Sequence, residues 1–169
     1  MTKRIKQLSI LFFILVLPSL IYVFLANGVH RHKSLPFLGE YSIVNGDTVQ
    51  HTIADFSFTN QFGETITQDS LFGDIIIVDF FFSTCAGICP EMSTQMMIVQ
   101  ENFRDIDDIK ILSHTVNPEY DNVDILSSYS EKYGAMKGKW HFVTGEKEQL
   151  YKMGVNSYLI PTQEDVLAP

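Results

Sequence analysis

The stretch that decides the fold is Ile75-Ile-Ile-Val-Asp-Phe-Phe-Phe-Ser-Thr-Cys85-Ala-Gly-Ile-Cys89-Pro-Glu-Met92, where an apolar run leads into two cysteines. Residues 75–82 are β-branched or aromatic around a single aspartate, and they predict a strand buried on both faces. Residues 90–103 place apolar side chains at helical spacing, and the proline that begins them suits a first helical turn. Cys85 and Cys89, the only cysteines of the chain, therefore lie where a strand passes into a helix.

Strand and helix patterns alternate along the rest of the chain. Residues 41–67 alternate apolar and polar side chains around two turn signals, which predicts hairpins at Asn45-Gly46-Asp47 and Asn60-Gln61-Phe62-Gly63. Further strands are expected at 109–116 and 140–143, and helices at about 121–133, capped by Asp121, and 146–153, capped by Thr144. This alternation predicts an α/β fold with a parallel core and right-handed crossovers.

The N-terminus has the pattern of an exported membrane protein. Three basic residues precede an uncharged run over residues 8–25, which is at the lower limit for a membrane-spanning helix. Small residues at 26–28 also offer a cleavage site, so a cleaved signal peptide remains the alternative to the favoured uncleaved anchor. We expect a cytoplasmic segment 1–7, a single anchor in the inner membrane, a tether at 26–34 and one domain at 35–169 facing the periplasm.

The charge of the expected exported part limits its partners. All twenty Asp and Glu residues lie beyond residue 39, whereas only nine of the twelve Lys and Arg residues lie within 26–169, so this part carries about −11. Phosphate binding needs clustered positive charge, and nucleic acid is therefore excluded as an expected partner. An exported compartment also permits disulfides, so a cysteine pair there is a redox or metal device.

Cysteines four residues apart share one face if the segment turns helically, so the sulfurs of Cys85 and Cys89 can converge. The positive end of the following helix favours thiolate over thiol. Two thiolates are soft ligands that suit Cu(I), and zinc only with more partners. The same pair can close a disulfide. A purely stabilising disulfide is the simpler alternative, but so short a loop constrains the unfolded chain little.

The run Phe-Phe-Phe-Ser-Thr-Cys85-Ala-Gly-Ile-Cys89-Pro-Glu-Met resembles the copper motif of the Sco/SenC family. Three further stretches agree in order and spacing, and the likeness covers roughly residues 35–160: Leu35-Pro-Phe-Leu-Gly39, Ser113-His-Thr-Val-Asn-Pro-Glu-Tyr-Asp121 and Trp140-His-Phe-Val-Thr-Gly145. The resemblance implies a thioredoxin-like, membrane-anchored protein that takes part in building the CuA centre of cytochrome c oxidase. It implies one Cu(I) ion held by both motif cysteines and by a histidine from a loop near the C-terminus.

The sequence departs from the family pattern at two places. No histidine follows His141, and the chain stops in a polar tail at Pro169. We therefore expect this sequence to be a fragment cut before the last strands and before the ligand loop. Asn117 stands where the family usually has an aspartate before proline, although asparagine keeps the turn-forming amide.

Other residues with metal-binding or redox chemistry have simpler explanations. His114 and His141 lie in strand patterns and are expected to be core or supporting residues rather than ligands. Helical spacing favours core packing over a thioether copper relay for Met92 and Met96. Asp79 has two equal interpretations, a buried acid that tunes the thiols or a residue facing solvent. The remaining candidates are expected to lie in the tether, the early β region, the same helix or the surface: His30, His32, His51, Met97, Asp107, Asp108, Glu146 and Glu148.

Three functions fit the cysteine pair, and they are ranked by their fit to the motif. The first is a metallochaperone that carries Cu(I) to the oxidase subunit with the CuA site and performs no turnover chemistry. The second is a thiol–disulfide oxidoreductase that reduces the cysteines of the acceptor, with Cys85 and Cys89 as its redox pair. The third, a peroxidase of the peroxiredoxin kind, ranks last because no proline precedes the adjacent Thr84.

Overall fold

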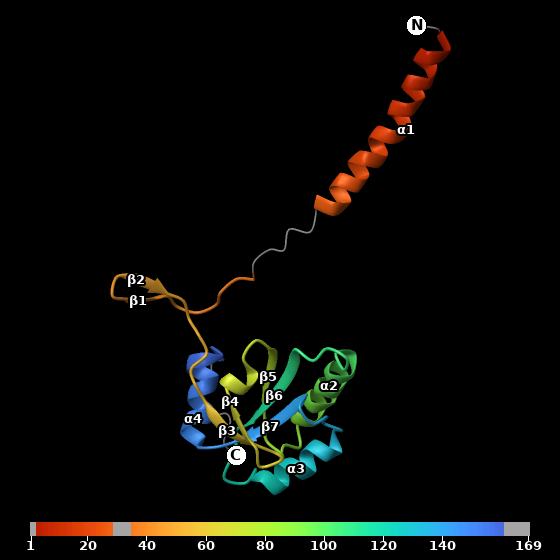
Figure 1. Ribbon diagram of the computed structural model, residues 1–169. Coiled ribbons are helices and arrows are strands. Elements are labelled where there is room, and N and C mark those ends of the chain that lie inside the picture. The colour runs from red at the N-terminus through yellow and green to blue at the C-terminus, as the bar shows by residue number, and fades with distance from the viewer. Residues whose placement is uncertain (1–2, 29–34, 161–169) are drawn as a thin grey trace. The chain divides into compact units, whose positions relative to one another are not determined.

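The computed structural model describes residues 3–28 and 35–160, which fall into two compact units (Figure 1). The first unit contains helix α1 (Lys3–Gly28). Among the described residues, this one helix is long and apolar enough to cross a membrane, over Arg4–Val23. The expected apolar helix is thus confirmed, and it extends three residues into the expected tether. The rest of the tether, with His30 and His32, lies outside the described residues.

Strands and short helices alternate along the second unit. In chain order they are β1 (Ser42–Val44), β2 (Asp47–Val49), β3 (Ser57–Asn60), β4 (Thr65–Thr67), the 3-10 turn η1 (Asp69–Leu71), β5 (Ile75–Phe81), α2 (Cys89–Asn102), β6 (Ile109–Thr115), α3 (Val123–Lys132), β7 (Trp140–Thr144), α4 (Lys147–Lys152) and the π-helical turn η2 (Met153–Ser157).

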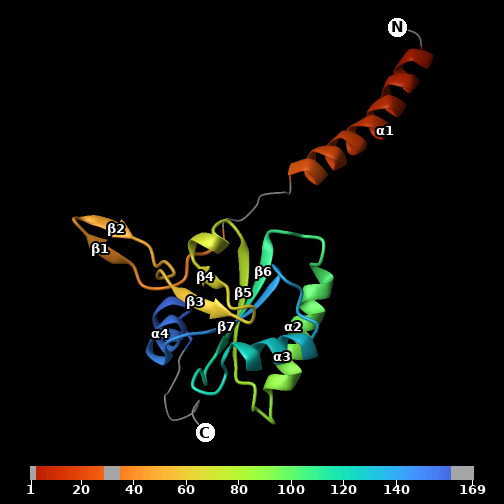
Figure 2. The same ribbon diagram turned by 60° about the horizontal axis from the view of Figure 1, so that its bottom comes forward.

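Five of these strands form one mixed sheet in the order β4-β3-β7-β6-β5. β5, β6 and β7 run parallel, whereas β3 pairs antiparallel with both β4 and β7. Helices α2 and α3 cover one face of the sheet, and α4 covers the other (Figure 2). The predicted α/β class is therefore confirmed, with a parallel core completed by antiparallel strands.

Both predicted hairpins are present. β1 and β2 pair around Asn45 and Gly46, whose φ angles of 54° and 90° are both positive, as a tight two-residue hairpin turn requires. β3 and β4 pair around Gly63, which has a φ of 74°. Glycine and asparagine adopt positive φ angles more readily than other residues, so the residue types at these turns favour the observed hairpins.

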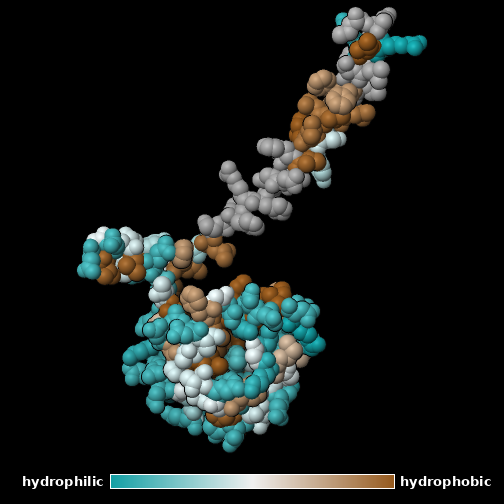
Figure 3. Space-filling model, viewed as in Figure 1, coloured by the Kyte–Doolittle hydropathy of each residue, from teal (hydrophilic) through white to brown (hydrophobic). Residues whose placement is uncertain are grey.

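Two hydrophobic cores lie against opposite faces of the sheet. The core under α2 and α3 contains fully buried aromatic and aliphatic residues from three strands, among them Phe81, Ile111 and Phe142. The core under α4 contains Phe58 and Val143. Figure 3 shows that the surface of this unit facing the viewer is mostly hydrophilic around apolar patches, in contrast to the apolar side chains along α1.

β5 occupies an edge of the sheet, so the prediction that residues 75–82 form a strand buried on both faces holds only in part. Both faces are covered, because Ile77 and Phe81 pack in the core under α2 and α3 and Ile76 packs against the core under α4, but most of the strand is only half-buried. Within the described part of the chain β5 pairs only with β6. Ile75 is 64% exposed, and only Asp79 and Phe81 of this strand are buried. An apolar run reports that the two faces of a strand are covered, but it carries no information on whether both edges are paired.

The helix caps also differ from expectation. The N-cap of α3 is Asn122, whose side chain accepts a hydrogen bond of 3.1 Å from the Ile125 amide, while Asp121 is fully buried and points elsewhere. The N-cap position of α4 is Glu146 rather than Thr144. The tail beyond Ile160 lies outside the described residues, so the expectation that the chain is a fragment stays a prediction.

Candidate metal centre

Cys85 lies in the loop after β5, and Cys89 is the first residue of α2. Both cysteines are free, Cys85 is half-buried, and Cys89 is 5% exposed within the core under α2 and α3. Their sulfurs are close enough to share a hydrogen bond. The strand thus delivers one sulfur to the surface, and the helix holds the other just beneath it.

The two thiols have opposite acidities. The hydrogen bond from the Cys89 thiol lowers the pKa of Cys85, and the backbone N–H groups of Cys89, Gly87 and Ile88 lower this pKa further because they too donate to the Cys85 sulfur. Burial raises the pKa of Cys89 to about 11, and its hydrogen bond to Cys85 contributes to the rise. Cys85 is therefore the thiol that ionises first and the one that solvent can reach.

A buried acid lies on the same side of the sheet. Asp79 is 7% exposed, and burial raises its pKa to about 6, although a hydrogen bond from the Ser113 hydroxyl partly opposes the rise. Ser113 in turn accepts a hydrogen bond of 2.9 Å from the indole nitrogen of Trp140. The charge of Asp79 adds to the causes that raise the pKa of Cys89. Of its two interpretations, the buried acid is correct.

Tyr129 in α3 and Tyr133, the C-cap residue that follows α3, pack in the same core as Cys89, a feature that the sequence reasoning missed. The hydroxyl of Tyr129 shares a hydrogen bond of 2.9 Å with Ser93, and burial raises its pKa. The Tyr133 hydroxyl is buried without a hydrogen-bond partner. Their four-residue spacing along α3 was the available signal, because residues at that spacing share a helix face.

The described histidines lie away from the cysteine pair, as expected. His114 is fully buried against the rings of Phe58 and Phe80, and burial lowers its pKa to about 3. His141 is 7% exposed, and its Nδ1 lies 3.2 Å from the Asn60 amide nitrogen. His51, at 2.9 Å from the carbonyl oxygen of Ser157, joins the early segment to η2.

Most of the remaining candidates also behave as expected. Met96 and Met97 pack against the core that contains Cys89, and Met92 is half-buried. Asn117 keeps its turn, because its backbone amide donates to the Thr115 hydroxyl at 3.0 Å. The four acidic candidates are all exposed, and the last of them pairs with Lys152 at 2.7 Å: Asp107, Asp108, Glu146 and Glu148.

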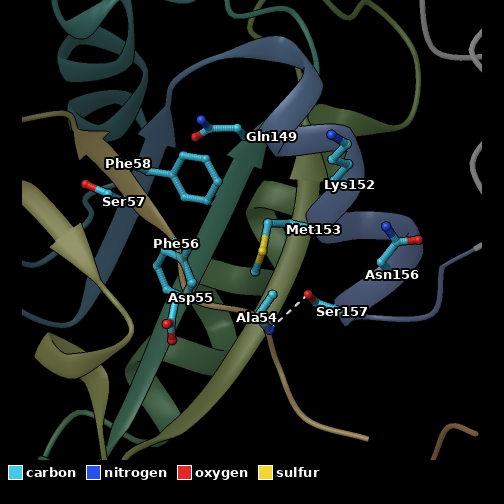
Figure 4. Close-up of a pocket in the computed structure, with 10 residues that line it drawn as sticks. All are labelled: Ala54, Asp55, Phe56, Ser57, Phe58, Gln149, Lys152, Met153, Asn156 and Ser157. Atoms are coloured by element: carbon cyan, nitrogen blue, oxygen red, sulfur yellow. Dashed lines mark hydrogen bonds between the residues drawn. The ribbon is translucent and has the colours of Figure 1, made fainter. Parts of the chain in front are cut away.

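A cavity of about 560 Å³ lies elsewhere, between the segment that leads into β3 and the helices α4 and η2 (Figure 4). The aromatic rings of Phe56 and Phe58 and the thioether of Met153 form its apolar part. Neither cysteine lines this cavity. It is therefore separate from the sulfur pair, which lies at the opposite face of the sheet.

The candidate metal centre consists of the sulfurs of Cys85 and Cys89. Among residues 3–28 and 35–160, no group of three or more His, Cys, Asp or Glu side chains is arranged to hold a metal ion. The chain therefore offers two adjacent sulfur donors at the start of a helix. Such a pair can coordinate a soft monovalent ion in a two-coordinate manner or close a disulfide.

The same combination of motif and fold is found in known proteins. The family model for SCO1/SenC matches residues 44–168, which is most of the chain. This chain belongs to the SCO1/SenC family. Its similarity to the SCO1 protein homolog of Bacillus subtilis strain 168 is 32% identity over 100 residues, covering 59% of this chain and 52% of that relative. The alignment thus spans about half the length of that family member.

Solved structures of family members share the fold. BsSco, described as having a disulfide switch and as a member of the Sco family of cytochrome c oxidase assembly proteins, is 28% identical with a TM-score of 0.61, covering 70% of this chain and 71% of that one. ScoI of Bradyrhizobium japonicum, solved with copper bound, is 22% identical with a TM-score of 0.57, covering 67% and 73%. The thioredoxin-like Sco fold is thus confirmed.

Proposed function

We propose that this protein binds one Cu(I) ion through Cys85 and Cys89 and delivers it to the subunit of cytochrome c oxidase that carries the CuA site. The observation that carries this proposal is the pair of free, hydrogen-bonded sulfurs at the start of α2. Membership of a family whose member BsSco is described as a cytochrome c oxidase assembly protein supports the destination.

The chemistry of the site suits transfer of the ion. Thiolates prefer Cu(I) among the common metal ions, and the helix N-terminus and three backbone N–H groups stabilise the negative sulfur. Cys85 is half-buried, so an acceptor's ligands can reach an ion bound there. Transfer would then proceed by ligand exchange between donor and acceptor sulfurs, without turnover chemistry.

We also propose that α1 anchors the protein in the inner membrane as a single uncleaved span. Residues 1–7 would stay in the cytoplasm, because basic flanks are retained on that side, and the domain would face the periplasm. The length and apolar composition of α1 support this arrangement. An oxidising compartment then makes control of the sulfur pair's redox state necessary.

Transfer is tested with the full chain in detergent. We expect Cu(I)-loaded protein, mixed without air with a reduced CuA-bearing oxidase domain, to lose its copper to that domain within the mixing time of the experiment. Mass spectrometry of the separated proteins measures the transfer, and a Cu(I)–glutathione solution at the same concentration serves as the control. Copper that stays with this protein, or moves no faster than from glutathione, would contradict delivery.

A second function, reduction of an acceptor disulfide, is favoured by the unequal acidity of the two cysteines. The Cys85 thiolate would attack the acceptor disulfide and release one acceptor thiolate. Cys89 would then lose its proton to that thiolate or to solvent and attack the Cys85 sulfur. This second attack closes the Cys85–Cys89 disulfide and releases the other acceptor thiol, so two electrons pass to the acceptor.

The order of attack gives a prediction for single variants. Cys89→Ser should accumulate a mixed disulfide between Cys85 and a model peptide disulfide, because no second sulfur resolves it. Cys85→Ser should form little adduct, since Cys89 is buried and its pKa is raised to about 11. Non-reducing mass spectrometry measures both, and equal adduct yields from the two variants would rule out this assignment of roles.

A further inference from the structure

Asp121 is a fully buried carboxylate in the connection between β6 and α3. None of the salt bridges among the described residues involves it. A buried carboxylate without a charged partner is costly unless hydrogen-bond donors replace its lost water. The hydrogen-bond donors to Asp121 therefore indicate its role in the structure.

The hydrogen-bond donors to Asp121 come from two segments, the loop after β5 and the end of β6. The backbone N–H of Ser83 donates to Oδ2 at 3.2 Å, and the Ser83 hydroxyl donates to Oδ1. The Thr115 hydroxyl at the end of β6 donates to Oδ2. One carboxyl group thus joins the end of β6 to the loop that carries the first cysteine.

Ser83, which donates to Asp121, lies inside the turn that leads from β5 to Cys85. The carbonyl oxygen of Phe82 accepts a hydrogen bond of 3.1 Å from the backbone N–H of Cys85, which closes the turn. Fixing the amide and hydroxyl of Ser83 therefore fixes the Phe82–Ser83 peptide, whose carbonyl oxygen holds the backbone of Cys85.

The segment that carries Asp121 is itself held in place. The backbone N–H of Asp121 donates to the Asn117 carbonyl oxygen at 2.9 Å, and the Val116 N–H donates to the Phe81 carbonyl oxygen at 2.8 Å. This connection is therefore attached to the end of β5 at one point and closed on itself at another. It forms a rigid support from which a carboxylate can hold the cysteine loop.

We propose that Asp121 is a positioning residue, whose carboxylate holds Ser83 so that the Cys85 sulfur stays beside Cys89 and within reach of the N–H groups of residues 87–89. The proposal deepens the proposed function, on which its copper consequence rests. Without the carboxylate the turn from Phe82 to Cys85 loses its anchor, and the Cys85 sulfur is no longer held in one place at the start of α2.

The test measures the alkylation rate of Cys85 by iodoacetamide at neutral pH, with peptide mapping by mass spectrometry, in the reduced full chain. We expect Asp121→Ala to slow the reaction about tenfold, the equivalent of about one hydrogen bond lost by a sulfur that is no longer held at the start of α2. Asp121→Asn keeps one acceptor oxygen and should slow it less. Ser83→Ala removes only the hydroxyl donor and should give an intermediate rate.

Gln61→Ala is the matched control, because Gln61 is equally buried and its amide bonds only to the backbone of β7. It should lower thermal stability and leave the alkylation rate within about twofold of the parent, since no cysteine contact changes. Unchanged rates in Asp121→Ala and Ser83→Ala would overturn the proposal. If Asp121→Ala does not fold, unchanged rates in Asp121→Asn and Ser83→Ala decide against it.

A parallel Cu(I) competition titration separates this inference from the proposed function. Weaker copper binding in Asp121→Ala, together with slow alkylation, is the expected result. If the parent protein itself binds no Cu(I), the proposed function fails, while the alkylation rates still decide the role of Asp121.

Discussion

Replacing Asp79 by asparagine is expected to stabilise the protein at pH 7 by about 3 kcal/mol, since its pKa rises from 3.8 to about 6 and each pKa unit costs the ionised form about 1.4 kcal/mol. Asp79 is 7% exposed and hydrogen-bonded by Ser113, but no salt bridge among the described residues neutralises it. Asparagine has nearly the same shape and still accepts that hydrogen bond. It removes the buried charge and replaces one carboxylate oxygen by an NH2 group.

The direction of the pH dependence follows from the raised pKa. The folded protein holds the Asp79 proton up to about pH 6, whereas the unfolded chain releases it near 3.8. Folding is therefore favoured by this group below pH 3.8, and that contribution is lost as the pH rises through the window from 3.8 to about 6. The asparagine variant should show no gain at pH 3.5 and its full gain at pH 7.

Urea unfolding of the reduced protein at both pH values, followed by the fluorescence of Trp140, measures this effect. Trp140 is the only tryptophan and hydrogen-bonds to the same Ser113, so it also reports on the surroundings of Asp79. Asp107→Asn is the matched control, because Asp107 is exposed, and its effect should stay near zero. A lower free energy of unfolding in Asp79→Asn at pH 7 would contradict this prediction, because it would show that folding does not destabilise the ionised carboxylate.

Local patterns were sufficient to predict most elements of the fold. Runs of β-branched or aromatic residues predicted β5, β6 and β7, and turn residues such as Asn45-Gly46 and Gly63, which have positive φ angles, predicted both hairpins. The cysteine pair at the junction of β5 and α2 was also predictable, because strand and helix patterns meet there. These features depend on residues close together in the sequence, where side-chain periodicity and turn chemistry decide the structure.

Features set by tertiary packing were not predictable. Asp121 sits next to a helix start and looks like a cap, yet its partner Ser83 is 38 residues away in the chain. The edge position of β5 depends on which strands lie beside it, and the acidity of Cys89 depends on burial by α3. One sequence without its contacts contains no signal for such long-range partners, so a buried acid and a surface cap look the same.

The two cysteines should each be indispensable for copper binding, which is the largest effect we expect from any single substitution. Two-coordinate Cu(I) needs both soft donors, and a serine oxygen is a poor substitute for a thiolate. Cys85→Ser and Cys89→Ser should therefore both lose tight binding, although burial differs between the two positions. Met92→Leu and Met96→Leu are the matched controls, because each removes a sulfur from α2 and leaves the cysteine pair intact.

Copper binding by the cysteine pair is tested by an anaerobic competition titration of the reduced full chain with a colorimetric Cu(I) chelator. We expect about one Cu(I) retained per chain in the parent and in both methionine variants, since soft sulfur pairs hold this ion tightly. We expect the chelator to remove all copper from either cysteine variant. If the parent protein yields its copper to the chelator, or if a cysteine variant keeps it, Cys85 and Cys89 are not the copper ligands.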